Sequence, residues 1–474
     1  MAVPLSGRAR GTPTLLRTMG LFSLVVYGVG DMVGAGIYGT VGDAAARMGN
    51  AVWLSFVVSM VAAVLTGLSY ACLASRYPRA AGAAYVTQRA FHVGFISYLI
   101  GLMVTASGLT SMATSTNVFT KTVLGLTATQ PDAAMQGWPW YLVALSFLGF
   151  LTLVNLWGIR QSMWANLLCT LVETGGLLFI IAIGVRYWGG VNYLETPNAT
   201  FGAGGEMLDP GLGLGMLLAG SVLTFFSFIG FEDMLNVSEE VKEPRRTMPW
   251  GIVLALLVGT ILYIGVAVTV VSVIPYQEFA QRDLSPLARV TRAAAPWLHP
   301  RTFDFVTLFA VSNTVLINYI MGSRLLYGMA RQGLMPAVLG RVHPTRRTPH
   351  VAILVLLAVV LVLAVSGGAD AVKQLADATA LLLLSSFMVV NTSLIVLKRR
   401  PGEPAGAFEV PIVVPALGVL VNAMLIGARI TSSTAGGQAL VIAGVIIGGI
   451  VILYFIVRPK NVTEKSLAAV EEAA

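Results

Sequence analysis

Apolar stretches about as long as a bilayer is thick recur throughout this chain, and they constrain its fold more than any other feature. A membrane-spanning helix needs roughly 20 consecutive apolar residues. Such stretches lie near residues 21–43, 51–75, 93–124, 139–157, 163–185, 212–235, 248–274, 302–328, 350–366, 374–397, 411–430 and 438–457. Pro, Gly or charged clusters separate most neighbours. The sequence therefore predicts an all-α membrane protein with about twelve transmembrane helices in one membrane domain.

The composition agrees with a lipid environment. Of the 474 residues, 56% are hydrophobic and 11% are charged, whereas soluble domains carry roughly 25% charged residues. A soluble fold this apolar would expose large hydrophobic patches, which a bilayer accepts. Most of the 30 Lys and Arg residues fall on the side of the amino terminus. Because cytoplasmic loops carry the excess of Lys and Arg, both termini are predicted to be cytoplasmic.

Cysteine and histidine usage gives no indication of a cofactor or metal. Cys72 and Cys169 fall inside predicted helices, which is not the pattern of a secreted disulfide framework. The four histidines lie in predicted loops or at span ends, without a second ligand at metal spacing. The first apolar stretch lacks a clear cleavage site and is interpreted as a helix of the mature protein. We therefore expect no cofactor, no metal and no nucleic-acid partner, with the lipid bilayer as the surrounding partner.

The first predicted span is unusually rich in glycine. From Tyr27 to Gly42 it reads YGVGDMVGAGIYGTVG, in which six of sixteen residues are glycine. Close packing of two helices explains a pair such as Gly30 and Gly34. Each glycine costs a helix about 1 kcal/mol relative to alanine, so six of them indicate local unwinding at Gly34, Ala35 and Gly36. Unwound backbone at membrane depth survives only where it is buried or lines a cavity, and its free N–H groups suit a carboxylate.

The sixth predicted span carries a second set of motifs. From Phe225 to Pro249 it reads FFSFIGFEDMLNVSEEVKEPRRTMP. This segment resembles the sixth helix of the amino acid, polyamine and organocation transporter superfamily, which has an aromatic-x-aromatic-I-G-F/V-acid motif and an EEVKNPRR-like loop. The GxGI of the first span, NLWG at 155–158 and RLLYGMARQGLMP at 324–336 extend the resemblance over most of the chain. Within this superfamily the chain resembles the cationic amino acid transporter group.

The resemblance implies a leucine-transporter-type fold with an inverted repeat of five plus five spans. The first repeat would cover 21–185 and the second 212–397, with peripheral spans at 411–457 and cytoplasmic tails at 1–20 and 458–474. Helices one and six would be discontinuous at mid-membrane, where transporters of this kind hold their substrate. The implied function is a secondary transporter that moves an amino acid across the cell membrane by alternating access.

The same resemblance assigns substrate-binding residues to both breaks. Backbone N–H groups of Gly34, Ala35 and Gly36, followed by Ile37, would bind the substrate carboxylate. Family members often have serine at the middle position, so Ala35 leaves this contact to the backbone alone. Carbonyls near the second break would accept hydrogen bonds from the α-amine, with the Phe226 ring as a gate rather than an ordinary packed aromatic. The residues concerned are Phe226, Ser227, Ile229 and Gly230.

Acidic residues in the spans are candidates for proton coupling, because a charge at the bilayer centre is costly unless it is paired or hydrated. Glu173 stands where many relatives place a lysine, and a buried carboxylate there is able to carry a proton between the two membrane faces. Asp31 lies one helical turn before Gly34 and would reach the substrate or Glu173, or else hold the break open. Glu232 and Asp233 follow the second break and are interpreted as residues that cap it or face the inner vestibule. The run from Glu239 to Arg246 is interpreted as a salt-bridged inner loop, with gating as the lesser alternative.

Other functions remain open at the level of sequence. A membrane enzyme would need a nucleophile with a base, or clustered metal ligands, inside the spans. A nutrient sensor would usually carry an added soluble domain. Within the transporter class, polyamine or organocation uptake is the nearest alternative, because acidic pocket residues attract a positive side chain. For the mode of transport, exchange and uniport are alternatives to proton symport. The predicted partners are a small-molecule amino acid, protons and lipid, with no obligate protein partner evident.

Overall fold

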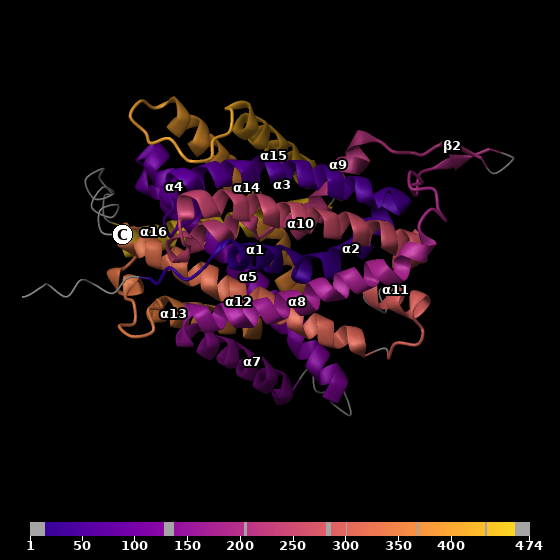
Figure 1. The fold of residues 1–474 in the computed structure, drawn as a ribbon, viewed down its shortest axis with the longest axis horizontal. Helices are drawn as coiled ribbons and strands as arrows, with labels where there is room; N and C mark the ends of the chain where they lie inside the picture. The colour runs from indigo at the N-terminus through magenta and orange to yellow at the C-terminus, as the bar shows by residue number, and fades with distance from the viewer. Residues whose placement is uncertain are drawn as a thin grey trace, which may run out of the picture.

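The computed structural model is a bundle of long helices that run side by side along one axis (Figure 1). It describes residues 15–127, 137–202, 206–280, 286–299, 301–366, 369–431 and 434–459. The predicted tails at 1–20 and 458–474 therefore lie mostly outside the described residues. The α-helices are α1 (Leu21–Val33), α2 (Ala35–Met48), α3 (Val52–Arg76), α4 (Gly82–Phe91), α5 (Gly94–Thr127), α7 (Trp138–Trp157), α8 (Ile159–Gly184), α9 (Leu214–Phe225), α10 (Pro244–Val273), α11 (Pro286–Ala294), α12 (Thr302–Arg331), α13 (His350–Ser366), α14 (Ala369–Arg399), α15 (Val413–Thr431) and α16 (Thr434–Val457).

Short elements connect these helices. The 3-10 helices are η1 (Gly49–Ala51), η2 (Val185–Tyr187), η3 (Phe226–Phe228), η4 (Phe231–Glu240), η5 (Tyr276–Ala280) and η6 (Ala337–Gly340). Strands β1 (Thr200–Phe201) and β2 (Met207–Asp209) form an antiparallel pair between α8 and α9. Figure 1 places this pair at the end of the bundle opposite the carboxyl terminus.

The predicted spans correspond closely to the observed helices. Eleven helices in the described part of the chain are long and apolar enough to cross a membrane. The remaining predicted stretch, 350–366, forms α13, whose 17 residues are fewer than the roughly 20 that a full crossing needs. Two short helices were not predicted, α4 and α11. Both contain polar residues and are too short for a membrane crossing, so the sequence indicated only loops there.

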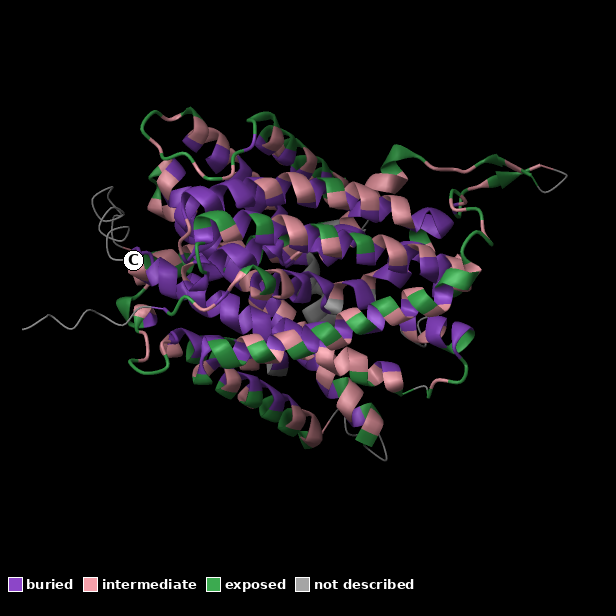
Figure 2. Cartoon of the chain, in the orientation of Figure 1, coloured by how far each residue is buried: buried purple, intermediate pink, exposed green. Residues whose placement is uncertain are grey.

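The outer faces of the bundle are apolar, as contact with lipid requires. Figure 2 shows buried residues along the middle of the bundle and exposed ones on the outer faces of α7 and α8. The exposed side chains on these two helices include Phe150, Leu153, Trp157, Trp164 and Leu168. Helix α1 lies inside, against α8, α10 and α12, whereas α16 is mostly exposed. Segments α1 and α2 are therefore central, and α16 is peripheral.

The segment before α1 closes one end of the bundle against η4. The backbone N–H groups of Thr18 and Met19 donate to the carbonyl of Glu240 (2.9 and 3.0 Å), and Lys242 donates to the carbonyl of Met19 (2.8 Å). Residues Met19 and Val241 thus form a parallel β-bridge. The Glu240 carboxylate in turn pairs with Arg324 of α12, with nitrogen–oxygen distances of 3.0 and 3.1 Å. Of the run predicted to be a salt-bridged inner loop, Glu240 therefore forms an ion pair, and its partner is Arg324 of α12 and not a cation of the run.

A second ion-pair cluster lies near the same end and is centred on Glu409, which is outside the helices long enough to span a membrane. The Glu409 carboxylate accepts hydrogen bonds from Arg76 (2.7 and 2.8 Å) and from Lys398. Partial burial disfavours the charged form of Glu409. The hydrogen bonds from Arg76 and Lys398 outweigh this effect and lower the pKa of Glu409 to about 2.

The lowered pKa of Glu409 predicts a pH-dependent contribution to stability. Because the folded-state pKa lies below the ordinary value of 4.5, the stabilisation is complete above that value and is lost as the pH falls through the folded-state pKa. For a partly exposed ion pair the expected loss is below about 1 kcal/mol. Unfolding midpoints of the wild type and Glu409→Gln should differ at neutral pH and converge in acid. A difference that is independent of pH would contradict the assignment.

Candidate functional site

The first break in the bundle interior is a single residue, Gly34. Helix α1 ends at Val33 and α2 begins at Ala35, with Gly34 between them at φ −44° and ψ −148°. A methyl group at Gly34 would collide with the Thr314 hydroxyl of α12, so glycine permits this close approach. The unwinding predicted for Gly34, Ala35 and Gly36 is thus shorter than expected, because the helix resumes at once. The first N–H groups of a helix have no intrahelical partner, so those of α2 remain able to bind an anion.

The second break is longer and lies in the sixth predicted span. Helix α9 ends at Phe225, one 3-10 turn follows, and Ile229 is extended. Gly230 then has φ of +129°, a conformation that side chains rarely adopt. The chain continues as η4, a 3-10 helix of ten residues, and runs that long are uncommon. The sixth span is therefore interrupted at the glycine of its family-like motif.

The two breaks face each other at close range. A methyl group at Gly230 would lie 2.9 Å from the carbonyl carbon of Asp31, and one at Gly36 would lie 3.1 Å from the Cα of Ser227. The hydroxyl groups of Thr40 and Ser227 share a hydrogen bond of 2.9 Å. Glycine at both breaks thus allows two backbones to meet inside the membrane.

Carbonyl groups of the second break differ in their partners. The Ser227 carbonyl accepts a hydrogen bond from the Tyr263 hydroxyl (2.6 Å), and the Phe226 carbonyl accepts one from the Ile229 N–H (3.3 Å). Each carbonyl oxygen has a second lone pair. These groups therefore keep acceptor capacity for a ligand.

A cavity of about 430 Å³ lies beside the two breaks, within the range of small-molecule sites. Five of the predicted site residues line it, namely Asp31, Gly36, Phe226, Ile229 and Gly230. Four others, Gly34, Ile37, Ser227 and Glu173, are buried and are not among its lining residues. Ala35 is the first residue of α2. The cavity extends along α2 and α5 to Asp43 and Lys121, away from the end closed by Met19.

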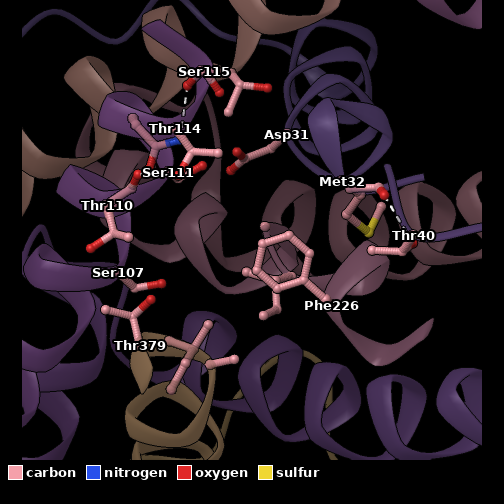
Figure 3. A pocket seen from close by; sticks show the side chains of 18 of the residues that line it. Asp31, Met32, Thr40, Ser107, Thr110, Ser111, Thr114, Ser115, Phe226 and Thr379 are labelled. Atoms are coloured by element: carbon pink, nitrogen blue, oxygen red, sulfur yellow. Dashed lines mark hydrogen bonds between the residues drawn. The ribbon is translucent and has the colours of Figure 1, made fainter. Parts of the chain in front are cut away.

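Hydroxyl side chains of α5 form one wall of this cavity, and sequence reasoning did not select them. Figure 3 shows them around the pocket, with Phe226 and Asp31 on other elements. The α5 residues concerned are Ser107, Thr110, Ser111, Thr114 and Ser115. They recur at helical spacing, a signal that was present in the sequence but that also fits a buried helix packed against its neighbours. From α12 the wall includes Thr314 and Asn318.

The acidic residues at the breaks divide into a cap and a pair. Glu232 accepts a hydrogen bond from the Gly230 N–H (2.8 Å), so it caps the second break as predicted. Asp233 instead lies close to Asp31 of α1, and the two carboxyl groups interact electrostatically. Asp31 and Asp233 line the cavity and are 8% and 5% exposed. The expected contact of Asp31 with Glu173 is not among the hydrogen bonds of the described residues.

Glu173 belongs to a separate polar network between α8 and α12. Its Oε1 accepts a hydrogen bond from Asn313 (3.0 Å), whose amide also donates to Thr170 (3.0 Å) and to the Gly30 carbonyl (3.4 Å). Within the described residues its Oε2 has no partner. Asn313 thus links the fifth and eighth predicted spans to the first, and it does so next to Glu173, the position at which the resemblance places a lysine in many relatives.

The two broken helices and the cavity beside them lie within residues 19–452, which match a family model described as amino acid permease. This match covers nearly the whole chain. The chain belongs to the amino acid permease family. This assignment confirms the family resemblance noted in the sequence, and the permease is a multi-pass helical membrane protein.

Several curated relatives resemble the permease over most of its length. A branched-chain amino acid permease of Bacillus subtilis is 28% identical over 88% of this chain and 89% of its own. A methylthioribose transporter of the same organism is 27% identical, over 84% and 85%. Cationic amino acid transporter 4 of Mus musculus is 31% identical, over 90% of this chain and 67% of its own. These names cover different ligands, so the relatives leave the permease's own substrate open.

Proposed function

We propose that this permease is a secondary transporter that moves an amino acid across the cell membrane by alternating access. The observation that carries the proposal is the meeting of two interrupted helices at one cavity of about 430 Å³. Interrupted helices supply unpaired peptide groups at membrane depth, where a zwitterion has few other partners. The family and the transporter names of its relatives support the same function.

In the proposed pose the substrate lies between the two breaks. Its carboxylate receives hydrogen bonds from the N–H groups at the start of α2, at Ala35, Gly36 and Ile37, next to Gly34, and the helix dipole adds a favourable charge. Its α-amine donates to carbonyls of the second break, at Phe226, Ser227 and Ile229, beside Gly230. The Phe226 ring, which lines the cavity, covers the bound substrate.

The repeat arrangement is part of the proposal. Spans within 21–185 and 212–397 form two inverted repeats around the site, 411–457 adds peripheral helices, and both termini are cytoplasmic. The mostly exposed α16 supports a peripheral position for the last span. Because the cavity extends away from the end closed by Met19 and Glu240, the observed state is one in which the substrate enters from the far side.

Proton coupling is proposed at Asp31 in preference to Glu173. Asp31 lines the cavity, so its carboxyl group exchanges protons with cavity water. Glu173 is fully buried against Asn313 outside the lining. The acidic residues also favour a second candidate function, the transport of a polyamine or other organic cation on the same fold. Exchange of substrates is the alternative to proton symport.

Uptake into proteoliposomes tests both the function and the coupling. Labelled amino acids and a polyamine are supplied with and without an inward proton gradient. We expect the gradient to stimulate amino acid uptake by the wild type and by Glu173→Gln, and to have no effect on Asp31→Asn. Gradient dependence that is lost in Glu173→Gln but kept in Asp31→Asn would move the coupling to Glu173. Uptake of the polyamine without any amino acid would overturn the proposed substrate.

A further inference from the structure

A groove between the start of α1 and the start of α8 has an apolar wall. The groove encloses about 540 Å³ at the end of the bundle that Met19 helps to close, and we call it the α1–α8 groove. Its wall includes Phe22 of α1 and Trp164 and Leu167 of α8. Phe22 and Trp164 are 71% and 68% exposed. Exposed aromatic side chains near the end of a membrane helix lie at the level of the lipid headgroups, so the groove is open to lipid.

Three cations line the polar part of the same groove. Arg17 precedes α1, Arg160 lies in the first turn of α8, and Lys242 lies between η4 and α10. All three are exposed. Among the hydrogen bonds and salt bridges of the described residues, none involves the side chain of Arg160 or of Lys242. None of the described residues that line the groove is acidic. An anion in the groove therefore meets positive charge without an opposing carboxylate.

A neighbouring basic cavity has a different charge balance. It encloses about 570 Å³ and shares Arg17 with the α1–α8 groove, but Glu243 is among its lining residues. Arg76, which also lines it, donates to the carboxylate of Glu409 at 2.7 Å. Cations of this second cavity thus already face carboxylates of the protein. The α1–α8 groove is therefore the better site for an external anion.

We infer that the α1–α8 groove binds an anionic phospholipid. Its phosphate accepts charge-assisted hydrogen bonds from Arg160 and Lys242, and its acyl chains lie along Phe22 and Trp164. Basic pockets between membrane helices are suited to such headgroups. A free phosphate would use the cations but leave the apolar wall uncovered, so a lipid fits the groove better. The residues that line the substrate cavity are different ones, and the inference therefore goes beyond the proposed function.

Quenching of Trp164 fluorescence by brominated lipid tests the site. The full-length protein is placed in phosphatidylcholine nanodiscs and titrated with phosphatidylglycerol or phosphatidylcholine that carries bromine on its acyl chains. The difference between wild type and Trp164→Phe isolates the signal of this one side chain. We expect phosphatidylglycerol to quench it at a concentration at least about tenfold lower, because two cations favour an anionic headgroup. Equal quenching by the two lipids would overturn the inference.

A second tryptophan controls for general enrichment of the anionic lipid around the protein. Trp138 is 73% exposed and begins α7, a full helix away from the start of α8. The difference between wild type and Trp138→Phe should show quenching without preference between the two lipids. An equal preference for phosphatidylglycerol at Trp138 and Trp164 would show an unspecific lipid shell and overturn the site.

Variants identify the cations that hold the headgroup. Arg160→Gln combined with Lys242→Gln should abolish the preference for phosphatidylglycerol at Trp164. Both side chains are exposed, so the midpoint of thermal unfolding in phosphatidylcholine should match the wild type. Arg341→Gln combined with Arg346→Gln removes two exposed arginines that do not line the groove, and this matched control should keep the preference. A preference that persists in the first double variant, or that is lost in both, would overturn the site.

Inorganic phosphate distinguishes a lipid from a soluble anion. Added at constant ionic strength, it should leave the quenching of Trp164 by brominated phosphatidylglycerol unchanged, because it makes no contact with the apolar wall. Displacement of the lipid by phosphate would overturn the lipid as occupant and assign the groove to a soluble phosphate. These measurements do not involve transport, so their outcome is independent of the proposed substrate.

Discussion

Replacing Gly230 with alanine is expected to abolish amino acid uptake. Gly230 has φ of +129°, and an added methyl group would lie 2.9 Å from the carbonyl carbon and 3.0 Å from the carboxyl carbon of Asp31. The backbone strain alone is worth about 1–3 kcal/mol. Because the nearest atoms include backbone, relief requires α1 and the second break to separate, which disrupts the proposed substrate contacts. Initial uptake rates in proteoliposomes measure the effect.

Gly149→Ala is the matched control for this variant. Gly149 lies within α7, and a methyl group there meets no atom within 4 Å. Alanine is also the better helix former, so uptake and stability should match the wild type. If Gly230→Ala transports as well as Gly149→Ala does, the second break has no role in holding the substrate.

The Arg324→Met variant is expected to lower the free energy of unfolding by about 3–5 kcal/mol. Arg324 and Glu240 are 1% and 0% exposed, and their side chains are paired in the bundle interior. Removal of the arginine leaves the Glu240 carboxylate buried without a counter-charge. Chemical denaturation of the purified protein measures the loss, which should be accompanied by a lower midpoint of thermal unfolding.

A double variant tests whether the destabilisation comes from the buried Glu240 carboxylate that is left without a counter-charge. Arg324→Met combined with Glu240→Met removes both charges, and apolar replacement of a buried ion pair is often neutral or stabilising. Most of the lost stability should therefore return. A double variant that is no more stable than Arg324→Met would show that the destabilisation comes from packing and not from the uncompensated carboxylate.

The sequence predicted the positions of the long helices well because lipid imposes a length and polarity on every crossing helix. The predicted stretch 350–366 coincides with α13, and 139–157 differs from α7 by one residue. The short helices α4 and α11 were not predicted because neither contains an apolar stretch as long as a membrane crossing. Glycine density located the first break, but it could not show that the helix resumes directly after Gly34. Nor could it show the close approach of Gly34 to Thr314, which is distant in sequence.

The site was less predictable because its contacts join distant segments. Asp233 follows a break and carries the local signature of a cap, yet it lies beside Asp31 of α1. Asp31 in turn was expected near Glu173, which binds Asn313 instead. The hydroxyls of α5 recur at helical spacing, but one chain gives no means of separating a cavity wall from a packed face. The partners of Asp31 and Asp233 and the position of the α5 hydroxyls at a cavity become visible only when α1, α5 and η4 are placed together in space.

The bridge between Met19 and Val241 has a consequence for how this end of the molecule can vary. Its three hydrogen bonds use peptide groups only, so the bridge itself sets no requirement on side-chain chemistry, whereas the buried side chains of Met19, Glu240 and Val241 are constrained by their own surroundings. Proline at Thr18, Met19 or Lys242 would break the bridge, because each of these residues donates its N–H and proline has none. Other substitutions at Thr18 and at exposed Lys242 can therefore accumulate without loosening the bridge, and residue identity alone would not reveal that it exists.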